Sequence, residues 1–249
     1  MKITFIGTGH GLPEKGRYRT AMMLEVGQDI YFIDVGAPVI NEMLRLDKPF
    51  KNIKAVFVTH THNDHMSAVI DMVDYISVTE SGASIDFYLP EENVIDAIKH
   101  YITITSLAPN EKDARMHTYD ESFVYEDENI RLTPFKTGHL KYRNRPSFGF
   151  VLECEGKRVV FSGDLSYLLE ENDFPKAATE CDSDVFICEM AHFDFELLSP
   201  YIEKCRTKAV YFNHIKHPTE RIPLLMRENE SGRVPFPIYA PSDGDVIEL

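Results

Sequence analysis

Residues Val56–Met66 read VFVTHTHNDHM, in which an apolar run leads directly into three histidines and an aspartate. His60, His62, Asp64 and His65 form the pattern H-x-H-x-D-H. Side chains alternate between the two faces of a strand, so His60 and His62 are expected to point the same way where the strand ends. The turn that follows directs Asp64 and His65 to a second point. Two pairs of ligands a short distance apart favour two metal ions over one.

Composition is consistent with a compact domain of ordinary size. The chain has 249 residues, enough to bury a substantial core, and we expect a single domain over residues 1–249. It carries 26 Lys+Arg against 40 Asp+Glu, a formal charge of −14. An acidic protein repels a polyanion, so the composition disfavours extended nucleic acid as a partner and leaves small substrates open.

The cysteines and the opening residues predict the compartment. The cysteines form no C-x-x-C pair and lie in or beside apolar segments, so we expect buried free thiols in a reducing compartment. They are Cys154, Cys181, Cys188 and Cys205. The opening MKITFIGTGHG has too short an apolar run for a signal peptide or a membrane span. A cytoplasmic protein that does not contact a membrane is the expectation.

Apolar periodicity predicts two successive strand-rich halves with peripheral helices. In the first half, strands are expected over residues 2–6, 21–26, 30–33, 55–58 and 85–89, and helices over 39–46, 65–76 and 90–104. In the second half, strands are expected over 123–125, 130–135, 148–153, 158–161, 184–188, 209–212 and 237–240, and helices over 195–205 and 219–228. Residues 106–120 are polar and contain proline, which indicates a surface loop. The predicted class is α/β (α+β), a four-layer αββα sandwich.

Three further residues stand where predicted strands end: His139, Asp164 and His214. Each alone is an ordinary loop residue, but the ordered series H-x-H-x-D-H, His, Asp, His resembles the metallo-β-lactamase superfamily of metal-dependent hydrolases. The fold of that superfamily is the αββα sandwich. The resemblance extends from the glycine-rich opening at Gly7-Thr8-Gly9 to His214.

The resemblance implies a ligand set for two divalent ions. By position, the first metal is bound by His60, His62 and His139, the second by Asp64, His65 and His214, and Asp164 bridges both. Zinc is the expected metal, with manganese or iron as alternatives, because the set offers imidazoles and carboxylates and no thiolate. Ions roughly 3.5–4 Å apart can share a bridging hydroxide that attacks the substrate. The oxygen-reducing diiron branch carries glutamate at the position of His62, so histidine there favours hydrolysis.

Within the superfamily the chain most resembles the ribonuclease Z and phosphodiesterase branch. The residues that carry this likeness are Phe5–Pro13 (FIGTGHGLP), Phe32–Gly36 (FIDVG), Asp64 at the second metal site, and Phe186–Phe193 (FICEMAHF) with Glu189 at an acidic motif. A His-Ser-Thr motif that supplies a proton in the branch has no counterpart between Phe193 and His214, and no basic arm for transfer RNA is present in the sequence. Transfer RNA is therefore disfavoured as a partner. A homodimer is common in the branch.

The acid–base groups are expected to be Asp64, Glu189 and His192. His192, three residues beyond Glu189, is our candidate to replace the missing proton donor or to orient a ligand. A histidine packed at a strand end is the structural alternative.

Candidate substrate-binding residues flank the ligands. Lys141, Arg143 and Arg145 follow His139 and form a basic loop suited to a phosphate, with a solvated turn as the alternative. His10 and His217 are further candidates for substrate contact, with plain loop histidines as the alternative.

Three functions remain open on these residues. The first is hydrolysis of a small phosphodiester, such as a cyclic nucleotide, a cyclic sugar phosphate or a short oligonucleotide. The second is hydrolysis of a carbonyl substrate, namely a lactone, thioester or lactam, by the same hydroxide. The third is a non-catalytic scaffold that binds metal. The basic loop and the branch resemblance favour the phosphodiester.

Overall fold

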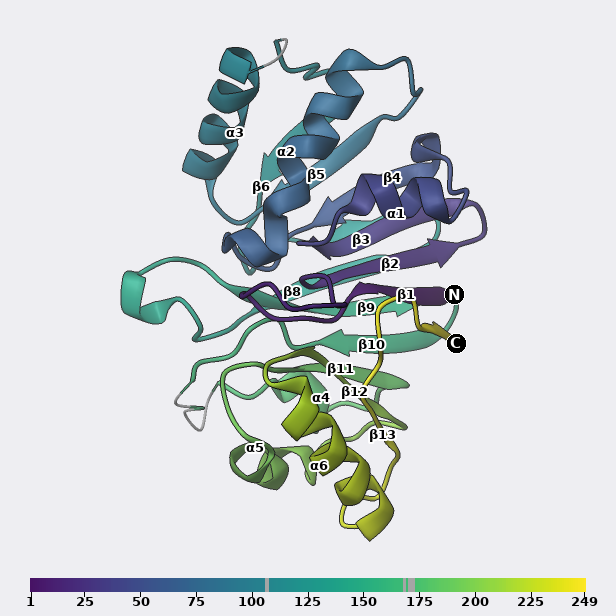
Figure 1. Cartoon of the computed structure of the whole chain (residues 1–249), viewed down its shortest axis with the longest axis vertical. Helices are drawn as coiled ribbons and strands as arrows, with labels where there is room; N and C mark the ends of the chain where they lie inside the picture. The colour runs from purple at the N-terminus through teal and green to yellow at the C-terminus, as the bar shows by residue number, and fades with distance from the viewer. Residues whose placement is uncertain (106–107, 168, 170–172) are drawn as a thin grey trace. The chain divides into compact units, whose positions relative to one another are not determined.

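The computed structural model describes residues 1–105, 108–167, 169 and 173–249, which form two compact units (Figure 1). Unit 1 comprises Met1–Gly7, Gly11–Tyr119 and Asp243–Glu248, and unit 2 comprises Thr8–His10, Asp120–Ser242 and Leu249. Each unit holds one sheet with its own helices, in agreement with the two strand-rich halves expected from the sequence. The assignment of residues 1–249 to a single domain stays a prediction.

Unit 1 contains a mixed sheet whose described strands lie in the order β14-β1-β2-β3-β4-β5-β6. Strands β14 to β3 pair antiparallel, and β3 to β6 pair in parallel. The strands are β1 Lys2–Gly7, β2 Ala21–Val26, β3 Asp29–Val35, β4 Ile53–Phe57, β5 Ile85–Leu89, β6 Ala114–Thr118 and β14 Val246–Glu248. The helices are α1 Val39–Arg45, η1 Phe50–Asn52, α2 Asn63–Val78 and α3 Glu92–Thr105.

Helix α2, which the sequence predicts over residues 65–76, packs on this sheet through an apolar stripe. Val69, Met72 and Val73 are fully buried and belong to one apolar cluster with Phe32 of β3 and Phe87 of β5. Residues three and four apart lie on one face of a helix, so this spacing holds α2 along the sheet. The helix begins at Asn63, two residues before the expected start, and His62 is its N-cap with an extended backbone. Burial of this stripe fixes the first turn of α2, which belongs to the histidine motif.

Unit 2 contains a second mixed sheet, with its described strands in the order β13-β12-β11-β10-β9-β8-β7. Strands β7 to β10 pair antiparallel, and β10 to β13 pair in parallel. The strands are β7 Tyr125–Glu126, β8 Arg131–Lys136, β9 Phe148–Cys154, β10 Lys157–Phe161, β11 Val185–Met190, β12 Val210–Ile215 and β13 Ile238–Tyr239. The helices are η2 Lys141–Arg143, α4 Lys176–Thr179, α5 Phe195–Ile202 and α6 Pro218–Ser231.

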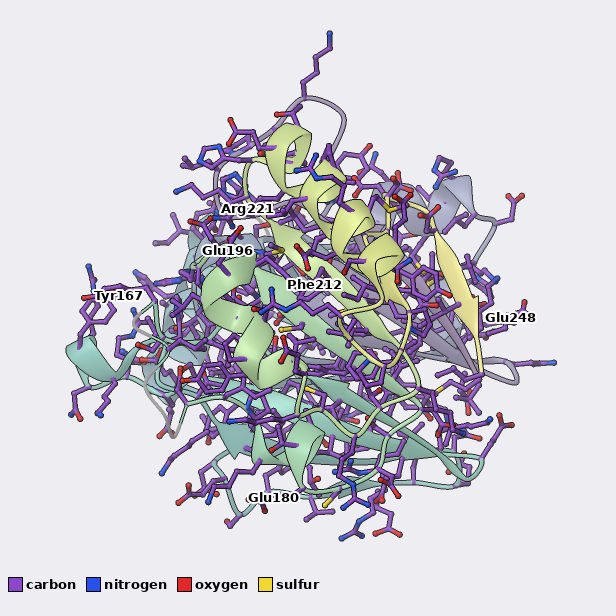
Figure 2. All side chains as sticks on the ribbon, turned by 90° about the horizontal axis from the view of Figure 1, so that it is seen from below. Tyr167, Glu180, Glu196, Phe212, Arg221 and Glu248 are labelled. Atoms are coloured by element: carbon purple, nitrogen blue, oxygen red, sulfur yellow. The ribbon has the colours of Figure 1, made fainter. Side chains whose placement is uncertain are left out.

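Helices α5 and α6 cover the parallel part of this sheet. Phe212 of β12 is fully buried beneath them, and its ring lies edge-on to Phe195 of α5 with centroids 5.9 Å apart (Figure 2). Phe212, Phe195 and Leu225 of α6 belong to one apolar cluster. Burying side chains of this size contributes about 1.5–3 kcal/mol each. The packing holds the carboxyl ends of β11 and β12 in place.

The structure corrects two expectations from the sequence. Residues 106–120 are not a loop throughout: β6 occupies Ala114–Thr118 and pairs in parallel with β5, whereas residues 106–107 lie outside the described residues. The strand is short and only Ala114 and Met116 of its five residues are apolar, too little to mark a strand in a polar stretch. The four cysteines are free thiols as expected, but Cys181 is exposed. Within the described ranges, no helix has the length and apolar character needed to cross a membrane.

Candidate metal centre

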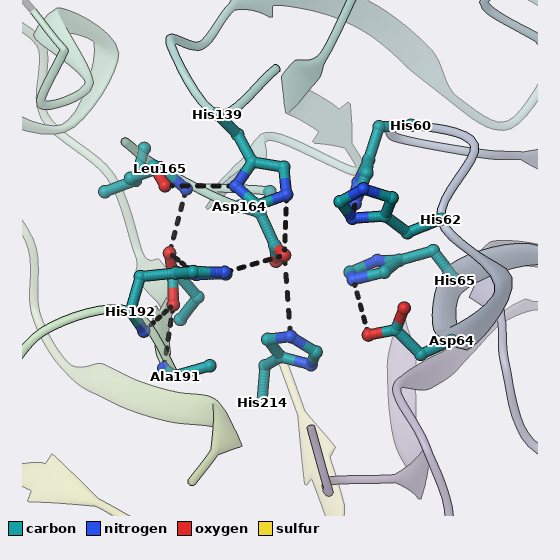
Figure 3. Close-up of polar contacts among 12 residues, drawn as sticks. His60, His62, Asp64, His65, His139, Asp164, Leu165, Ala191, His192 and His214 are labelled. Carbon is teal, nitrogen blue, oxygen red and sulfur yellow. Dashed lines mark hydrogen bonds and ion pairs between the residues drawn. The ribbon is translucent and has the colours of Figure 1, made fainter. Parts of the chain in front are cut away.

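The motif cluster, defined as His60, His62, Asp64 and His65, lies where β4 runs into α2 (Figure 3). His60 Nε2 and His62 Nδ1 are 3.1 Å apart, and the His60 and His65 rings have centroids 4.0 Å apart. Two nitrogens that bind one tetrahedral zinc at about 2.0–2.1 Å are separated by about 3.3 Å. The His60–His62 spacing therefore fits two ligands of one ion. This agrees with the expectation from the sequence that the two side chains point the same way.

Asp34 orients His65 from the end of β3. Its Oδ2 accepts a hydrogen bond from His65 Nδ1 at 2.7 Å, and its Oδ1 accepts one from the Thr59 backbone N–H at 2.8 Å. Asp34 is the extra residue where the β2–β3 register shifts, and its φ is +56°. A bulge of this kind redirects one side chain out of the strand alternation. Because Nδ1 carries the proton, Nε2 of His65 is left as the atom for a metal.

Close packing at Gly36 and a buried tyrosine also stabilise the region where β4 ends and α2 begins. A Cβ at Gly36 would lie 1.7 Å from the Asp64 carbonyl oxygen, so only glycine permits this approach of β3 to the start of α2. Tyr119 donates a hydrogen bond from its hydroxyl to the Val58 carbonyl at 2.6 Å. Full burial, and then the charge of Asp34, raise the pKa of Tyr119 well above its usual value. The phenol therefore stays protonated and keeps this hydrogen bond.

The Asp164 cluster, defined as His139, Asp164, His192 and His214, lies in unit 2 at the carboxyl ends of strands of its sheet. These residues follow or end β8, β10, β11 and β12, which all run in the same direction. Strands that run in the same direction end at the same edge, where ligands collect in open α/β sheets. The topology thus gathers residues that are far apart in the sequence.

One oxygen of Asp164 faces three imidazoles. Its Oδ2 lies 3.6 Å from His139 Nε2, 3.5 Å from His214 Nε2 and 3.8 Å from His192 Nε2, and Asp164 is 3% exposed (Figure 3). The ligand atoms of His139, Asp164 and His192 all lie within 4.8 Å of one another. These separations exceed the usual hydrogen-bond range of about 2.7–3.2 Å and match distances between ligands of a common ion.

The other ring nitrogens of these histidines bind fixed acceptors. His139 Nδ1 donates to the Leu165 carbonyl at 3.3 Å, and His214 Nδ1 donates to the Gly9 carbonyl at 3.2 Å. Metal-binding histidines usually donate their second N–H to a carbonyl or carboxylate, which fixes the ring and leaves Nε2 for the ion. The donor set therefore fits divalent metal on the evidence of its ring orientations as well as its composition.

A bulge places His214. Glu189 pairs with Asn213 and Met190 with Ile215, so His214 is the extra residue in β12, and its φ is +53°. The sequence places His214 at a strand end, but the strand continues through Ile215. The bulge turns the His214 ring out of the strand alternation towards Asp164.

Glu189 and His192 form a hydrogen-bonded pair at the end of β11. Glu189 Oε1 accepts from His192 Nδ1 at 2.8 Å and from the Leu165 backbone N–H at 2.8 Å. Glu189 Oε2 accepts from the Ala191 backbone N–H at 2.8 Å. His192 is 25% exposed, and its Nε2 points towards Asp164. The sequence interpretation of His192 as a residue of the site is thus compatible with its position, and its role stays a prediction.

The candidate substrate-binding residues have differing surroundings. Lys141 and Arg143 are exposed on η2, in a loop that projects beyond the end of its sheet (Figure 1), and the Arg143 guanidinium lies 5.5 Å from the Tyr142 ring centroid. Arg145 is partly buried. His10 is buried beside the bridge between Gly9 and Ile215, and His217 is exposed at the start of α6. Substrate contact by these residues stays a prediction.

A buried thiol near the cluster does not act as a ligand. Cys188 precedes Glu189 in β11 and is fully buried. Burial, and then the charge of Glu189, raise the pKa of Cys188 well above its ordinary value. Successive side chains of a strand point to opposite faces, so Cys188 points away from Glu189, into the apolar cluster with Phe195 and Phe212. This agrees with a ligand set of imidazoles and carboxylates.

Comparison with known proteins relates the sequence to two groups. The profile of the family described as anti-Pycsar protein Apyc1 matches residues 1–223. Ribonuclease Z of Microcystis aeruginosa (strain NIES-843 / IAM M-2473) is 30% identical over 137 residues, which are 53% of this chain and 42% of that protein. The chain spans about half the length of the curated relatives it matches.

Solved structures with this fold are similar over nearly the whole chain. YhfI from Bacillus subtilis, a metallo-beta-lactamase fold protein, superposes with a TM-score of 0.76 at 15% identity and 99% coverage of both chains. The short form of human tRNase Z superposes with a TM-score of 0.73 at 19% identity, covering 100% of this chain and 99% of that one. The expected class, an α/β chain with the metallo-β-lactamase fold, is confirmed.

Proposed function

This chain belongs to the family described as anti-Pycsar protein Apyc1, and we propose that it is a dinuclear, metal-dependent hydrolase of small phosphodiesters. One observation carries most of the proposal: the Nε2 atoms of His139 and His214 face a single buried oxygen of Asp164 at 3.6 and 3.5 Å, distances too long for hydrogen bonds. Imidazoles and carboxylates gathered in this way suit zinc, manganese or iron, with zinc as the expected metal.

The ligand assignment that we propose follows the order of the family motif. By that order, His60, His62 and His139 would hold the first ion, Asp64, His65 and His214 would hold the second, and Asp164 would be shared by both. Within unit 2, the position of Asp164 supports a bridging role, because the His139 and His214 nitrogens lie at nearly equal distances, 3.6 and 3.5 Å, from the same oxygen. Within unit 1, the 3.1 Å spacing of His60 and His62 supports their sharing an ion.

The reaction divides between the metals and the chain. Two bound divalent ions supply a nucleophile at neutral pH by lowering the pKa of water from about 16 towards about 7, and they stabilise charge that develops on phosphate oxygens. Asp34 and the Leu165 carbonyl keep the histidine rings in their binding orientation. When the phosphorus–oxygen bond to the leaving group breaks, that oxygen needs a proton. His192, fixed through Nδ1 by Glu189, presents Nε2 to donate it.

Phosphorus is favoured over a carbonyl carbon for two reasons. The basic loop offers exposed lysine and arginine beyond His139, and arginine binds phosphate oxygens bidentately. The relatives named above are a ribonuclease Z and a tRNase Z, whose names denote cleavage of RNA. That likeness does not support the exclusion of transfer RNA inferred from the sequence. A small substrate is supported by the formal charge of −14.

Metal analysis with a matched substrate panel tests this function. We expect up to two equivalents of zinc, manganese or iron per chain, and turnover of bis-p-nitrophenyl phosphate and of a cyclic nucleotide. Turnover of p-nitrophenyl acetate without turnover of either phosphodiester would move the assignment to carbonyl substrates. Bound metal without any turnover would favour a scaffold, and cleavage of a transfer-RNA precursor alone would replace the small substrate. A homodimer and a cytoplasmic location stay predictions.

Replacing His192 with alanine is expected to affect substrates according to their leaving groups. A cyclic nucleotide releases an alkoxide that needs a proton, so its kcat is expected to fall by about 10²-fold or more. Bis-p-nitrophenyl phosphate releases p-nitrophenolate, which leaves without protonation, so its kcat is expected to fall by less than about fivefold. Steady-state kinetics on both substrates measure the difference, and added imidazole is expected to restore part of the lost rate.

His100→Ala provides the control, because His100 is an exposed histidine of α3. Its kcat is expected to stay within about twofold of wild type for both substrates. If His192→Ala also stays within about twofold for the cyclic nucleotide, His192 is not the proton donor.

The basic loop is expected to act on substrate binding. Joint replacement of Lys141, Arg143 and Arg145 with alanine should raise KM for a phosphodiester about tenfold, since loss of charge-assisted contacts of about 1.4 kcal/mol gives this factor. KM for a neutral ester should change by less than about twofold.

A control variant removes the same number of charges elsewhere in unit 2. Lys204, Arg206 and Lys208 lie before the start of β12, at the opposite end of that strand from His214. Their joint replacement should leave both KM values within about twofold of wild type. Equal effects of the two triple variants would indicate a general charge effect and count against phosphate binding by the loop.

A further inference from the structure

We propose that Asp173 is a positioning residue that ties the loop of His139 to the loop of Asp164 and thereby sets the metal affinity of unit 2. This inference rests on the proposed function, because it takes both residues to be metal ligands. Asp173 acts on the backbone next to the ligand residues, through the Gly138 and Ser166 N–H groups.

The Asp173 carboxylate accepts a backbone hydrogen bond from each loop. Its Oδ1 accepts from the Gly138 N–H, one residue before His139, and its Oδ2 accepts from the Ser166 N–H, two residues after Asp164. Hydrogen bonds to an ionised acceptor are roughly twice as strong as neutral ones. One side chain therefore joins two ligand-bearing loops that are far apart in the sequence.

Gly138, Asp173 and Ser166 are closely packed where the two loops meet. A Cβ at Gly138 would lie 2.7 Å from Asp173 Oδ1 and 3.3 Å from Ser166 Cβ. The two loops and the carboxylate are thus in direct contact, and the absence of a side chain at position 138 is what allows the approach. A small displacement of Asp173 would shift both loops together.

The residue after Asp173 anchors it to the core of unit 2. Phe174 is 5% exposed, and its ring stacks on Tyr201 of α5 at 5.3 Å and lies edge-on to Phe186 of β11 at 5.8 Å. Aromatic pairs of this geometry contribute about 0.5–1.5 kcal/mol beyond their burial. The carboxylate therefore has a rigid support.

Glu189 and Asp173 bind two successive backbone amides in the loop of Asp164, so their contributions can be separated. Glu189 accepts from the Leu165 N–H, and Asp173 accepts from the next amide, that of Ser166. The Leu165 carbonyl in turn accepts from His139 Nδ1. Without Asp173 the loop of Asp164 keeps its bond to Glu189, but the His139 loop loses its backbone attachment to it. We therefore expect a loss of metal affinity rather than a loss of the fold.

Asp173→Asn tests the inference on the full chain with Zn²⁺ as the probe. Asparagine keeps the size of the side chain but accepts only one of the two N–H groups and places an N–H₂ against the other. Competition with a chromophoric chelator is expected to show about 10- to 100-fold weaker zinc binding, the range typical of residues that support ligands. The absorption spectrum of the Co²⁺-loaded variant should change, and kcat should fall while KM stays within about twofold.

Asp182→Asn is the matched control, since Asp182 is 82% exposed and pairs with Arg206 at the surface of unit 2. Its zinc affinity and Co²⁺ spectrum should equal those of wild type. Unfolding of each variant is followed by circular dichroism, so that a folding defect is separated from a binding defect.

Gly138→Ala gives a second, independent test that leaves Asp173 in place. The added methyl group meets Asp173 Oδ1, so zinc affinity is expected to fall in this variant. In an Asp173→Ala background the clash is absent, and the same change should have little further effect. Additive losses in the double variant, or unchanged zinc affinity in Asp173→Asn, would overturn the inference. A wild-type chain that binds no metal would overturn it together with the proposed function, whereas metal binding without phosphodiester turnover would overturn only the latter.

Discussion

Replacing Asp164 with asparagine is expected to lower kcat/KM for a phosphodiester by about 10³-fold or more and to reduce the bound metal to at most one equivalent. An amide cannot supply the negative charge that a bridging ligand shares between two cations. The charge stabilisation and the nucleophile that the ions supply are worth several kcal/mol, and each 1.36 kcal/mol corresponds to a factor of ten. Steady-state kinetics and metal analysis by mass spectrometry on the same preparation measure both effects.

Asp184→Asn is the control for this change. Asp184 lies before the start of β11, at the end of that strand remote from Glu189, and forms an ion pair with Lys208 at 2.7 Å. Its replacement should leave metal content unchanged and kcat/KM within about twofold. An Asp164→Asn variant that keeps both equivalents of metal and most of its activity would rule out the bridging role.

Removal of metal by a chelator is expected to abolish activity and lower the melting temperature. A ligand that binds only the folded chain stabilises it by about 2.7 kcal/mol at a hundred times its Kd. For a chain of this size, about 1 kcal/mol corresponds to roughly 2–4 °C, so a fall of about 5–10 °C is expected. Differential scanning fluorimetry over a range of zinc concentrations measures it, and kcat is expected to return on adding zinc or manganese.

The Asp164→Asn variant serves as the internal comparison, because its melting temperature should depend less on zinc. Full activity in a chelated sample that mass spectrometry shows to be free of metal would contradict a metal-dependent reaction. Loss of activity with no change in melting temperature at any zinc concentration would contradict binding to the folded chain at this affinity.

The sequence predicts the parts of the fold that depend on local pattern. The apolar run before the histidines and the three- and four-residue spacings of Met66, Val69 and Val73 predict β4 and α2, and both are present. The ligand candidates could be named because imidazoles and carboxylates recur where strands end. The missed strand β6 is short and lies at an edge, and only two of its five residues, Ala114 and Met116, are apolar.

The supporting residues of the site could not be found from local pattern. Asp34 is an acid in the buried part of β3, which is a visible signal in the sequence, but its bond to His65 depends on a bulge. His214 owes its direction to a second bulge, and Asp173 to contacts with two distant loops. Each bulge lies one residue from the end of its strand, with only Val35 or Ile215 after it, so too few residues follow to show a change of alternation in the sequence.

The pairing of β14 with β1 has a consequence for how the chain is made on the ribosome. Lys2 pairs with Glu248, and the Phe5 backbone bonds to both Asp245 and Gly244. The residues that pair with the outer edge of β1 are translated more than two hundred positions later. At about 5–20 residues per second, this interval is roughly ten to fifty seconds. During that time the backbone groups of this edge lie open to a neighbouring nascent chain. Residues Val246–Glu248 cover this edge of β1 once they have been made, which ends that exposure.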